Sequence, residues 1–388
     1  MRLLYAIQRI GWQEAGALRF RPESQGAGLP GGDEWHMPDV ITDASEVTAD
    51  WLQAVLRRHG CLLTGRVSEV KKSARQTTTS TVVRLSVRYS EDSLGSAPPR
   101  LLLKIPTPGF HPQFGENEVE FYQRVAPAMG SPPAVRCYDA AYSPETKRCH
   151  LLLEDLSASH VEVDSRPSPP RETCEYIMDC LARFHAFWWE HPRLGEDIGS
   201  APQVPDVATM QEHLAGFLSF LRDQLPLSRQ RICRKVVSTA LDRWRRRFVE
   251  KRTRPNDGLT VIHGDAHFEN FLVPREAEQN RIRIIDWQFW NVSVGPQDLA
   301  FMIARNWTRE ERRLLEMDLV RRYHDGLLRH GVEGYAWEQC WRDYREQAIE
   351  NVLIPMWQWQ GQLTPETDWD GLEKAFDAFE DLDCEELL

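Results

Sequence analysis

The stretch Val261–Val273, VIHGDAHFENFLV, carries two histidines, two acidic residues and an asparagine between two short apolar runs. Such runs predict short buried strands, with the polar residues in the turn between them. A turn with this many groups able to bind metal or move protons is a candidate functional site. The intervals between these polar residues, together with motifs elsewhere in the chain, indicate which chemistry the turn serves.

The spacing within this stretch is that of a protein-kinase catalytic loop. His263 is followed by Asp265 and then, after four intervening residues, by Asn270. In such a loop the aspartate accepts a hydroxyl proton and the asparagine binds metal. Asp286 ends the next apolar run, RIRII, where kinases have their other metal-binding aspartate. We expect a hairpin to bring Asn270 and Asp286 together as oxygen ligands of magnesium (Mg²⁺).

A second candidate group lies upstream, where the predicted strand RLLLKIP contains one lysine, Lys104. A lysine in an otherwise apolar strand needs a partner, and Glu118 on the next predicted helix can provide it. This pair would position Lys104 on the phosphates of a nucleotide. Further on, the segment LLLED contains Glu154 and leads into the second half of the chain. We expect the backbone of this connector to receive the adenine ring.

The chain divides into three parts of different character. Residues 1–36 are rich in glycine and proline and predict a loose N-terminal extension, and either Met1 or Met37 is the natural start. Residues 37–156 predict a helix capped by Thr48, alternating strands and one inserted helix, the nucleotide-binding lobe.

Residues 157–388 change to long amphipathic helices, one of which begins with a Thr308/Glu311 capping box. We expect this part to be the catalytic and acceptor-binding lobe. The predicted fold class is therefore α+β: a two-lobed, protein-kinase-like fold with a small antiparallel sheet lobe and a large, mainly helical lobe.

Composition narrows the classes of function. The net charge of −11 argues against a nucleic-acid partner, and no apolar run approaches the length of a membrane span. Eight cysteines without a Cys-x-x-Cys pair indicate reduced, mostly buried thiols and a cytoplasmic protein. The oligomeric state is left open.

The motifs resemble the aminoglycoside phosphotransferase/choline kinase superfamily, and in particular its ecdysteroid-kinase-like branch. The resemblance covers residues 38–388 and is carried by VIHGDAHFEN, IIDWQFWNVSVGPQDLA, LARFHAFWW and ENEVEFY. It implies a small-molecule kinase that uses ATP and Mg²⁺. The roles it implies are a general base or hydroxyl-orienting group (Asp265), magnesium ligands (Asn270 and Asp286), a phosphate contact with its orienting partner (Lys104 and Glu118), and a carboxylate that hydrogen-bonds the catalytic loop (Asp298).

Two positions depart from the protein-kinase pattern. No glycine occurs between Gly65 and Gly95, where a glycine-rich loop should cover the phosphates, and SARQTTTST at 73–81 stands there instead. Its hydroxyl and backbone N–H groups would have to cradle the phosphates. Gly264 occupies the position of the protein-kinase arginine that reads a phosphorylated activation loop, which predicts a constitutively assembled site.

The expected activity is ATP- and magnesium-dependent phosphorylation of a hydroxyl group on a small molecule. A nucleotide-binding pseudokinase that acts as a scaffold is an alternative, because of the missing glycines. A metallohydrolase using His263, Asp265 and His267 is another, but it needs further ligands on other strands and leaves Lys104 unexplained.

Individual side chains also have alternative interpretations. We expect His263 to orient the loop and His185 to be a satisfied core histidine, whereas His267 either touches substrate or faces solvent. Trp357, Trp359 and Trp369 either wall an acceptor pocket or belong to the helical core. Sterol-like, choline-like and aminoglycoside acceptors are all compatible with the sequence.

Overall fold

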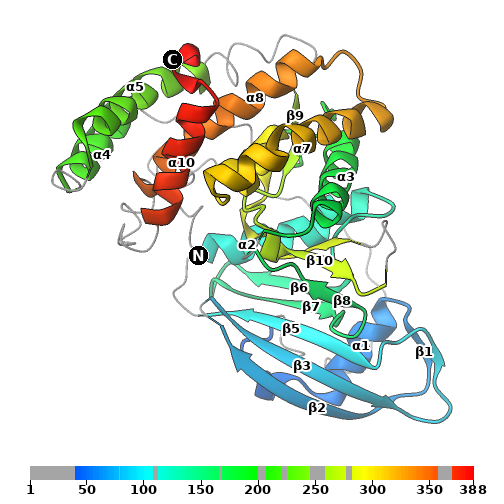
Figure 1. Ribbon diagram of the computed structural model, residues 1–388. Helices are drawn as coiled ribbons and strands as arrows, with labels where there is room; N and C mark the ends of the chain where they lie inside the picture. Colours follow the sequence, from blue (N-terminus) through cyan, green and yellow to red (C-terminus); the bar gives the residue numbers. More distant parts are fainter. Residues whose placement is uncertain are drawn as a thin grey trace.

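The computed structural model describes residues 40–77, 79–107, 112–165, 168–199, 207–220, 225–244, 258–276, 282–356 and 369–388. Within them the chain forms a sheet lobe and a larger helical lobe (Figure 1). The predicted α+β, two-lobed fold is thereby confirmed. The predicted N-terminal extension, Met37, Trp357 and Trp359 lie outside the described residues.

The sheet lobe is built on five antiparallel strands in the order β2-β3-β5-β7-β6. Their bounds are Val67–Gln76 (β2), Ser80–Tyr89 (β3), Arg100–Pro106 (β5), Arg148–Glu154 (β7) and Cys137–Ser143 (β6). The sequence predicted four of these strands and missed β6. This edge strand has one buried residue and no alternation of apolar and polar side chains, so its position follows from pairing with β7.

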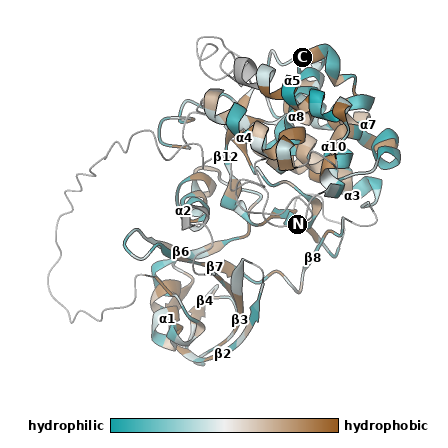
Figure 2. Ribbon diagram, turned by 90° about the vertical axis from the view of Figure 1, so that its left-hand side faces the viewer, coloured by the Kyte–Doolittle hydropathy of each residue, from teal (hydrophilic) through white to brown (hydrophobic). Residues whose placement is uncertain are grey.

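Helix α1 (Ala49–Arg58) covers one face of this sheet, as its apolar pattern predicted. The side chain of Thr48 caps the helix by accepting a hydrogen bond from the backbone N–H of Trp51 at 3.0 Å. Leu101, Leu103 and Ile105 of β5 are buried in the same hydrophobic cluster as α1. Figure 2 marks hydrophobic residues on α1 and on the neighbouring strands in brown. Because side chains alternate along a strand, Lys104 points to the opposite face.

Helix α2 (Pro112–Glu120) packs on β6 and β7, on that opposite face. It continues as a wider turn at Phe121–Val125 and a tight one at Ala126–Ala128, where Pro127 ends it. The sequence predicted this helix from residue 116, and the structure extends it one turn earlier. A two-stranded ribbon of β1 (Leu62–Thr64) and β4 (Leu94–Gly95) completes the lobe.

The larger lobe consists mainly of long helices (Figure 1). Its helices are α3 (Arg171–Trp188), α4 (Val207–Phe220), α5 (Leu227–Trp244), α6 (Pro296–Leu299), α7 (Arg309–Arg329), α8 (Trp337–Glu350) and α10 (Trp369–Asp381). Helices α3 and α7 lie against each other, and Arg322 of α7 pairs with Asp179 of α3 at 2.6 Å.

Short strands connect the lobes. The predicted hairpin forms between β10 (Phe271–Pro274) and β11 (Arg283–Ile284), and Ile285 N–H donates to the carbonyl of Asn270 at 3.0 Å. A third strand, β8 (His160–Glu162), pairs with β10. Strands β9 (Leu259–Ile262) and β12 (Asn291–Val294) form a separate antiparallel pair. The sequence missed β8 and β12, which are too short to show a periodic pattern.

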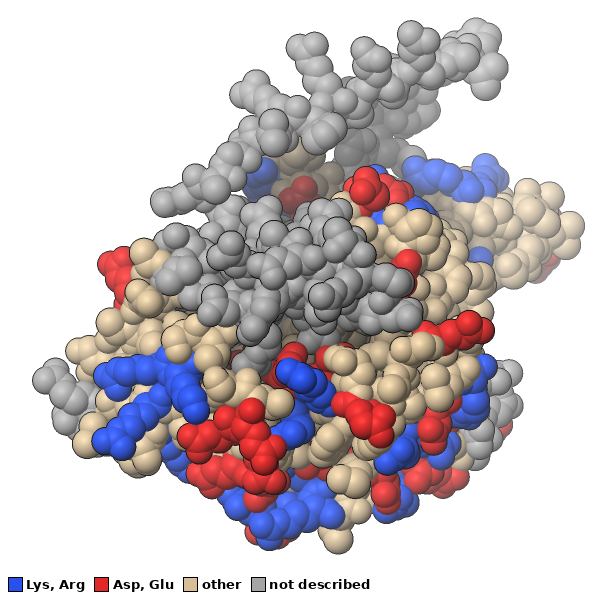
Figure 3. Space-filling view, turned by 90° about the horizontal axis from the view of Figure 1, so that it is seen from above, with Lys and Arg blue, Asp and Glu red and all other residues tan. Residues whose placement is uncertain are grey.

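Three features that the composition predicts can be compared with the structure: membrane spans, surface charge and the burial of the cysteines. No helix in the described part of the chain is long and apolar enough to cross a membrane. Figure 3 shows basic and acidic side chains interspersed on the face seen there. All eight cysteines are free, and only Cys137 is not fully buried. The prediction that most of the thiols are buried is confirmed.

Replacing Thr308 by alanine should destabilise the protein by about 1 kcal/mol, the usual effect of losing an N-cap. Thr308 Oγ1 accepts from Glu311 N–H at 3.3 Å, and Thr308 N–H donates to Glu311 Oε2 at 2.7 Å. Urea unfolding measures the change. Thr308→Ser keeps the cap and is the control, so equal stabilities for the two variants would contradict the importance of this cap.

Candidate active site

The ammonium group of Lys104 lies between two carboxylates from different parts of the chain. Its Nζ is 2.7 Å from Glu118 Oε2, on α2, and 2.7 Å from Asp286 Oδ1, at the end of the β10–β11 hairpin. The side chains of Lys104, Glu118 and Asp286 are 14%, 3% and 18% exposed. The sequence predicted the pair with Glu118. It did not predict the direct contact between Lys104 and Asp286.

The three charges determine one another's ionisation. Burial acts to lower the pKa of Lys104, but Asp286 and Glu118 outweigh it and raise that pKa above the ordinary value. Burial acts to raise the pKa of Asp286, and Lys104 more than reverses this, so the pKa of Asp286 is lowered. Burial raises the pKa of Glu118, with Lys104 opposing it. Lys104 and Asp286 therefore form a charged pair between the lobes.

The helix that carries Glu118 is fixed to the segment that follows Asp286. Asn117 Nδ2 donates to the carbonyls of Gln288 at 2.8 Å and Trp290 at 3.1 Å. The indole N–H of Trp290 donates back to the carbonyl of Asn117 at 2.7 Å. The rings of Phe121 and Trp287 are stacked with their centroids 3.9 Å apart. Glu118 and Asp286 thus sit on one rigid unit, a role that the sequence did not reveal for these aromatic residues.

Asp298 organises the first half of the opening motif. Its carboxylate is fully buried and accepts hydrogen bonds from the backbone N–H groups of His263 at 2.8 Å and Gly264 at 2.9 Å. His185 Nε2 lies 3.2 Å from the same carboxylate, and His185 Nδ1 lies 2.9 Å from the hydroxyl of Tyr323. His185 is buried and satisfied, as expected, but its partner is the carboxylate that holds the loop.

His263 connects this loop to the strand that leads to Asp286. Its Nδ1 accepts the backbone N–H of Asp265 at 3.3 Å, so the ring proton is on Nε2, which donates to the carbonyl of Ile285 at 2.9 Å. His263 therefore orients the backbone on both sides of the site.

Asp265 and Asn270 lie together in the turn. Asn270 Nδ2 donates to the backbone carbonyl of Asp265 at 2.8 Å, which leaves the amide oxygen of Asn270 for another ligand. The side chain of Asp265 is buried, and its Oδ1 atom has no hydrogen-bond partner. A buried carboxylate oxygen without a partner is costly unless a ligand completes it.

The residues that the sequence assigned to magnesium fit that ion chemically. The amide oxygen of Asn270 and the carboxylate of Asp286 are hard oxygen donors, and Asn270 contacts the backbone of Asp265, the residue that carries the unpartnered oxygen. Asp286 has a left-handed backbone, with φ of 66°, a conformation that costs a non-glycine residue on the order of 1–3 kcal/mol. Such strain is typical of functional sites. Among the described residues, no group of three or more His, Cys, Asp and Glu side chains could hold a metal, so the metallohydrolase alternative is not favoured.

The turn in place of a glycine-rich loop is closed on itself. Thr77 N–H donates to the carbonyl of Ser80 at 2.8 Å, and Ser80 N–H donates to Thr77 Oγ1 at 3.1 Å. Thr79 is buried, and Thr78 lies outside the described residues. In the predicted adenine connector, Glu154 N–H donates to the carbonyl of Arg136 at 2.9 Å and is not free to bind a base.

His267 and Glu269 form an ion pair beside Asp265. His267 Nδ1 is 2.9 Å from Glu269 Oε2, and His267 Nε2 is 3.6 Å from Asp265 Oδ2. Ser165 donates a hydrogen bond to the other oxygen of Glu269. The side chain of His267 is 11% exposed, so it does not face solvent freely. The sequence motif contained Glu269, but nothing in it pointed to the partner Ser165.

Replacing Gly264 by alanine should disrupt the loop far more than the same change at Gly60. Both glycines have positive φ, +79° and +69°. A Cβ at Gly264 would lie 2.2 Å from the carbonyl oxygen of Phe289, whereas one at Gly60 would meet nothing within 4 Å. We expect Gly60→Ala to lose about 1 kcal/mol in urea unfolding and Gly264→Ala at least about twice that. Equal losses would mean that the backbone contact at Phe289 is easily relieved.

The fold of the chain is similar to that of solved structures. The fold resembles a candidate aminoglycoside phosphotransferase from Ralstonia eutropha, at 12% identity and a TM-score of 0.54, over 87% of this chain and 98% of that one. A weaker likeness is to aminoglycoside 2'-phosphotransferase-IIIa, at 10% identity and a TM-score of 0.48, over 88% of this chain and 100% of that one. Another is to the ethanolamine kinase of Plasmodium vivax, at 13% identity and a TM-score of 0.46, over 81% of each chain.

No curated protein sequence matches the chain. The model of the ecdysteroid kinase-like family matches residues 77–332, more than half of the sequence. This range contains Lys104, Glu118, Asp265, Asn270 and Asp286. The chain belongs to the ecdysteroid kinase-like family.

Proposed function

We propose that the protein is an ATP- and magnesium-dependent phosphotransferase that phosphorylates a hydroxyl group of a small molecule. The observation that carries this proposal is the meeting of Lys104, Glu118 and Asp286 from the sheet lobe, α2 and the hairpin, next to the Asp265–Asn270 turn. A buried cation beside two oxygen donors and a separate carboxylate matches the parts that phosphoryl transfer requires. Membership of the ecdysteroid kinase-like family supports the same activity.

In this proposal the nucleotide enters at the Lys104–Asp286 contact. Lys104 would exchange Asp286 for the phosphate oxygens of ATP and keep Glu118, which is more deeply buried and holds the ammonium in place. Asp286, released from Lys104, and Asn270 would hold magnesium. When bound, the ion neutralises negative charge on the phosphate oxygens. The phosphate contact and the magnesium site would therefore form together. Asp286 would lose its ionic contact with the ammonium of Lys104 and gain one with the magnesium ion.

Asp265 would receive the acceptor. Its unpartnered Oδ1 can accept the proton of a hydroxyl group and align the oxygen with the transferring phosphoryl group. Asp298 holds the turn through the backbone of His263 and Gly264, without a phosphorylated segment. The site would therefore be assembled in every state of the protein, which suits an enzyme for small molecules.

The proposal assigns nucleotide binding to residues 37–156 and acceptor binding to residues 157–388, in a cytoplasmic protein. Trp369, at the start of α10, is half-buried against the helical core, in agreement with its alternative interpretation as a packing residue. Apolar, cationic and sugar-like hydroxylated acceptors all fit these assignments.

A nucleotide-binding scaffold without catalytic turnover is a second candidate. It is favoured by the turn at Thr77–Ser80, because the backbone N–H groups of Thr77 and Ser80 bond within the turn and are not offered to phosphates. The two candidates differ in one measurable property, the release of ADP from ATP in the presence of hydroxylated acceptors or water.

Replacing Asp265 by asparagine should lower ADP release by about 10²–10⁴-fold, the usual contribution of a positioned general base. Binding of ATP with magnesium, measured as a rise in Tm, should persist, because Asp265 is not one of the proposed ligands of the nucleotide. A variant that retains full turnover would remove Asp265 from this role. A wild type that binds nucleotide but never releases ADP with any acceptor would favour the scaffold.

A further inference from the structure

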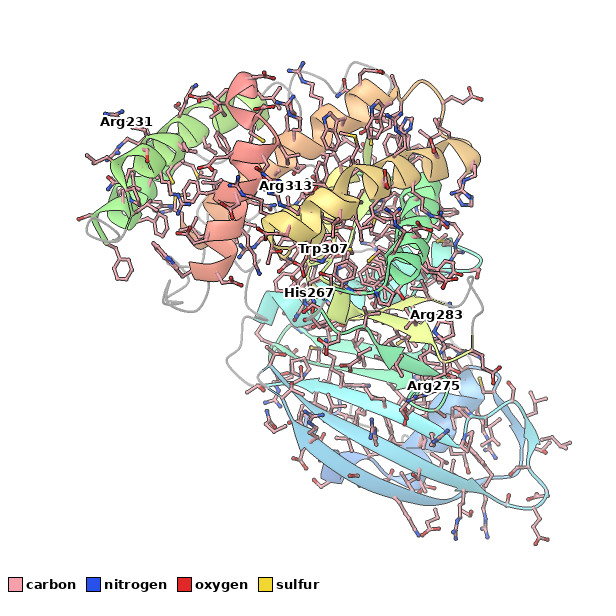
Figure 4. All side chains as sticks on the ribbon, viewed as in Figure 1. Arg231, His267, Arg275, Arg283, Trp307 and Arg313 are labelled. Atoms are coloured by element: carbon pink, nitrogen blue, oxygen red, sulfur yellow. The ribbon has the colours of Figure 1, made fainter. Side chains whose placement is uncertain are left out.

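His267 lies next to Asp265 and has no task in the proposed reaction. It projects from the turn between Asp265 and Asn270, and Figure 4 shows it where the helical lobe meets the sheet lobe, below Trp307. Its two ring nitrogens face different carboxylates, Glu269 at 2.9 Å and Asp265 at 3.6 Å. This arrangement differs from that of His263, whose ring has one donor and one acceptor.

Two facing carboxylates favour the doubly protonated ring. A neutral imidazole has a single N–H group, so one of its nitrogens would turn a lone pair toward a carboxylate oxygen. The imidazolium form places an N–H group on each side and adds an attraction between opposite charges. In agreement with this, burial acts to lower the pKa of His267, but Asp265 and Glu269 raise it to about 10.

The ring is held from outside the turn as well. Glu269 binds His267 with one carboxylate oxygen and accepts the hydroxyl of Ser165 with the other. Ser165 belongs to the segment after β8, between the lobes. Because Glu269 contacts both His267 and Ser165, it ties the ring to a segment outside the turn.

The position of His267 decides which oxygen of Asp265 is free. Among the described residues, the Oδ1 atom of Asp265 is buried without a hydrogen-bond partner. The imidazolium attracts Oδ2 from one side. A carboxylate that would otherwise rotate about its terminal bond is thereby kept in one orientation, with Oδ1 left for a hydroxyl proton.

We propose that His267 is a positioning residue of this site: held by Glu269 and Ser165, it fixes Asp265 through Oδ2 and presents Oδ1 to the acceptor hydroxyl. The inference rests on the proposed function, because it assigns the orientation of the group that receives the acceptor. No bond to His267 is made or broken in the reaction. Its effect should therefore appear in kcat and not in the affinity for ATP.

The test compares His267→Gln, His267→Lys and Glu269→Gln with the wild type, using ADP release from ATP and magnesium. His267→Gln should lower kcat by about 10–100-fold, the scale of a small misplacement of a reacting group, at an unchanged KM for ATP. Glu269→Gln should show the same pattern with a smaller loss. His267→Lys should recover part of kcat, because it restores the charge. His330→Gln, an exposed histidine after α7, is the matched control.

The outcomes are distinguishable. An unchanged kcat in folded His267→Gln, or a loss confined to the KM for ATP, would overturn the positioning role and leave the kinase proposal standing. If His267→Gln does not fold, Glu269→Gln carries the same comparison, and its kcat should fall while the rise in Tm with ATP and magnesium persists. A wild type with neither ADP release nor a nucleotide-induced rise in Tm would overturn the proposed function, and the inference with it.

Discussion

The arrangement of the two lobes depends on the ion pairs that the buried ammonium of Lys104 makes with two carboxylates. Lys104 binds Glu118 and Asp286, which come from a helix and a hairpin distant in sequence. A buried charge that loses one partner typically destabilises a protein by about 3–5 kcal/mol, so strand β5, helix α2 and the end of β11 have to meet at this point. Asn117 and Phe121 support the same junction through the residues after Asp286.

A second buried side chain, Asp298, holds the opening motif in place, and it is connected to the Lys104 ion pair through His263. Asp298 accepts the backbone N–H groups of His263 and Gly264, while His263 donates to the carbonyl that precedes Asp286. The loop that presents Asp265 is therefore fixed relative to the ion pair that would meet the nucleotide. Gly264 makes this possible, since any side chain there would collide with the backbone at Phe289. The loop backbone at His263 and Gly264 is thus held by the side chain of Asp298.

The sequence predicted the features whose signals are local. The cap at Thr48, the capping box at Thr308, the hairpin from Asn270 to Asp286 and the pair of Lys104 with Glu118 all follow from spacing along one or two neighbouring elements. The partners that it missed lie far apart in the chain: Asp286 for Lys104, His185 for Asp298, and Ser165 for Glu269. Periodicity reports which face of an element is buried, but not which residue of another element meets it. Strand β6 was not predicted for the same reason, since its conformation is determined by pairing with β7 and not by its own sequence pattern.

The central claim is that Lys104 and Asp286 form a site for ATP and magnesium, and a thermal-shift titration with and without magnesium tests it most directly. For the wild type, ATP with magnesium should raise Tm, corresponding to about 2.7 kcal/mol at a ligand concentration of 100 times Kd, and ATP alone should raise it less. In Asp286→Asn the difference made by magnesium should disappear. Equal stabilisation of wild type and variant, or no effect of magnesium on the wild type, would contradict the account.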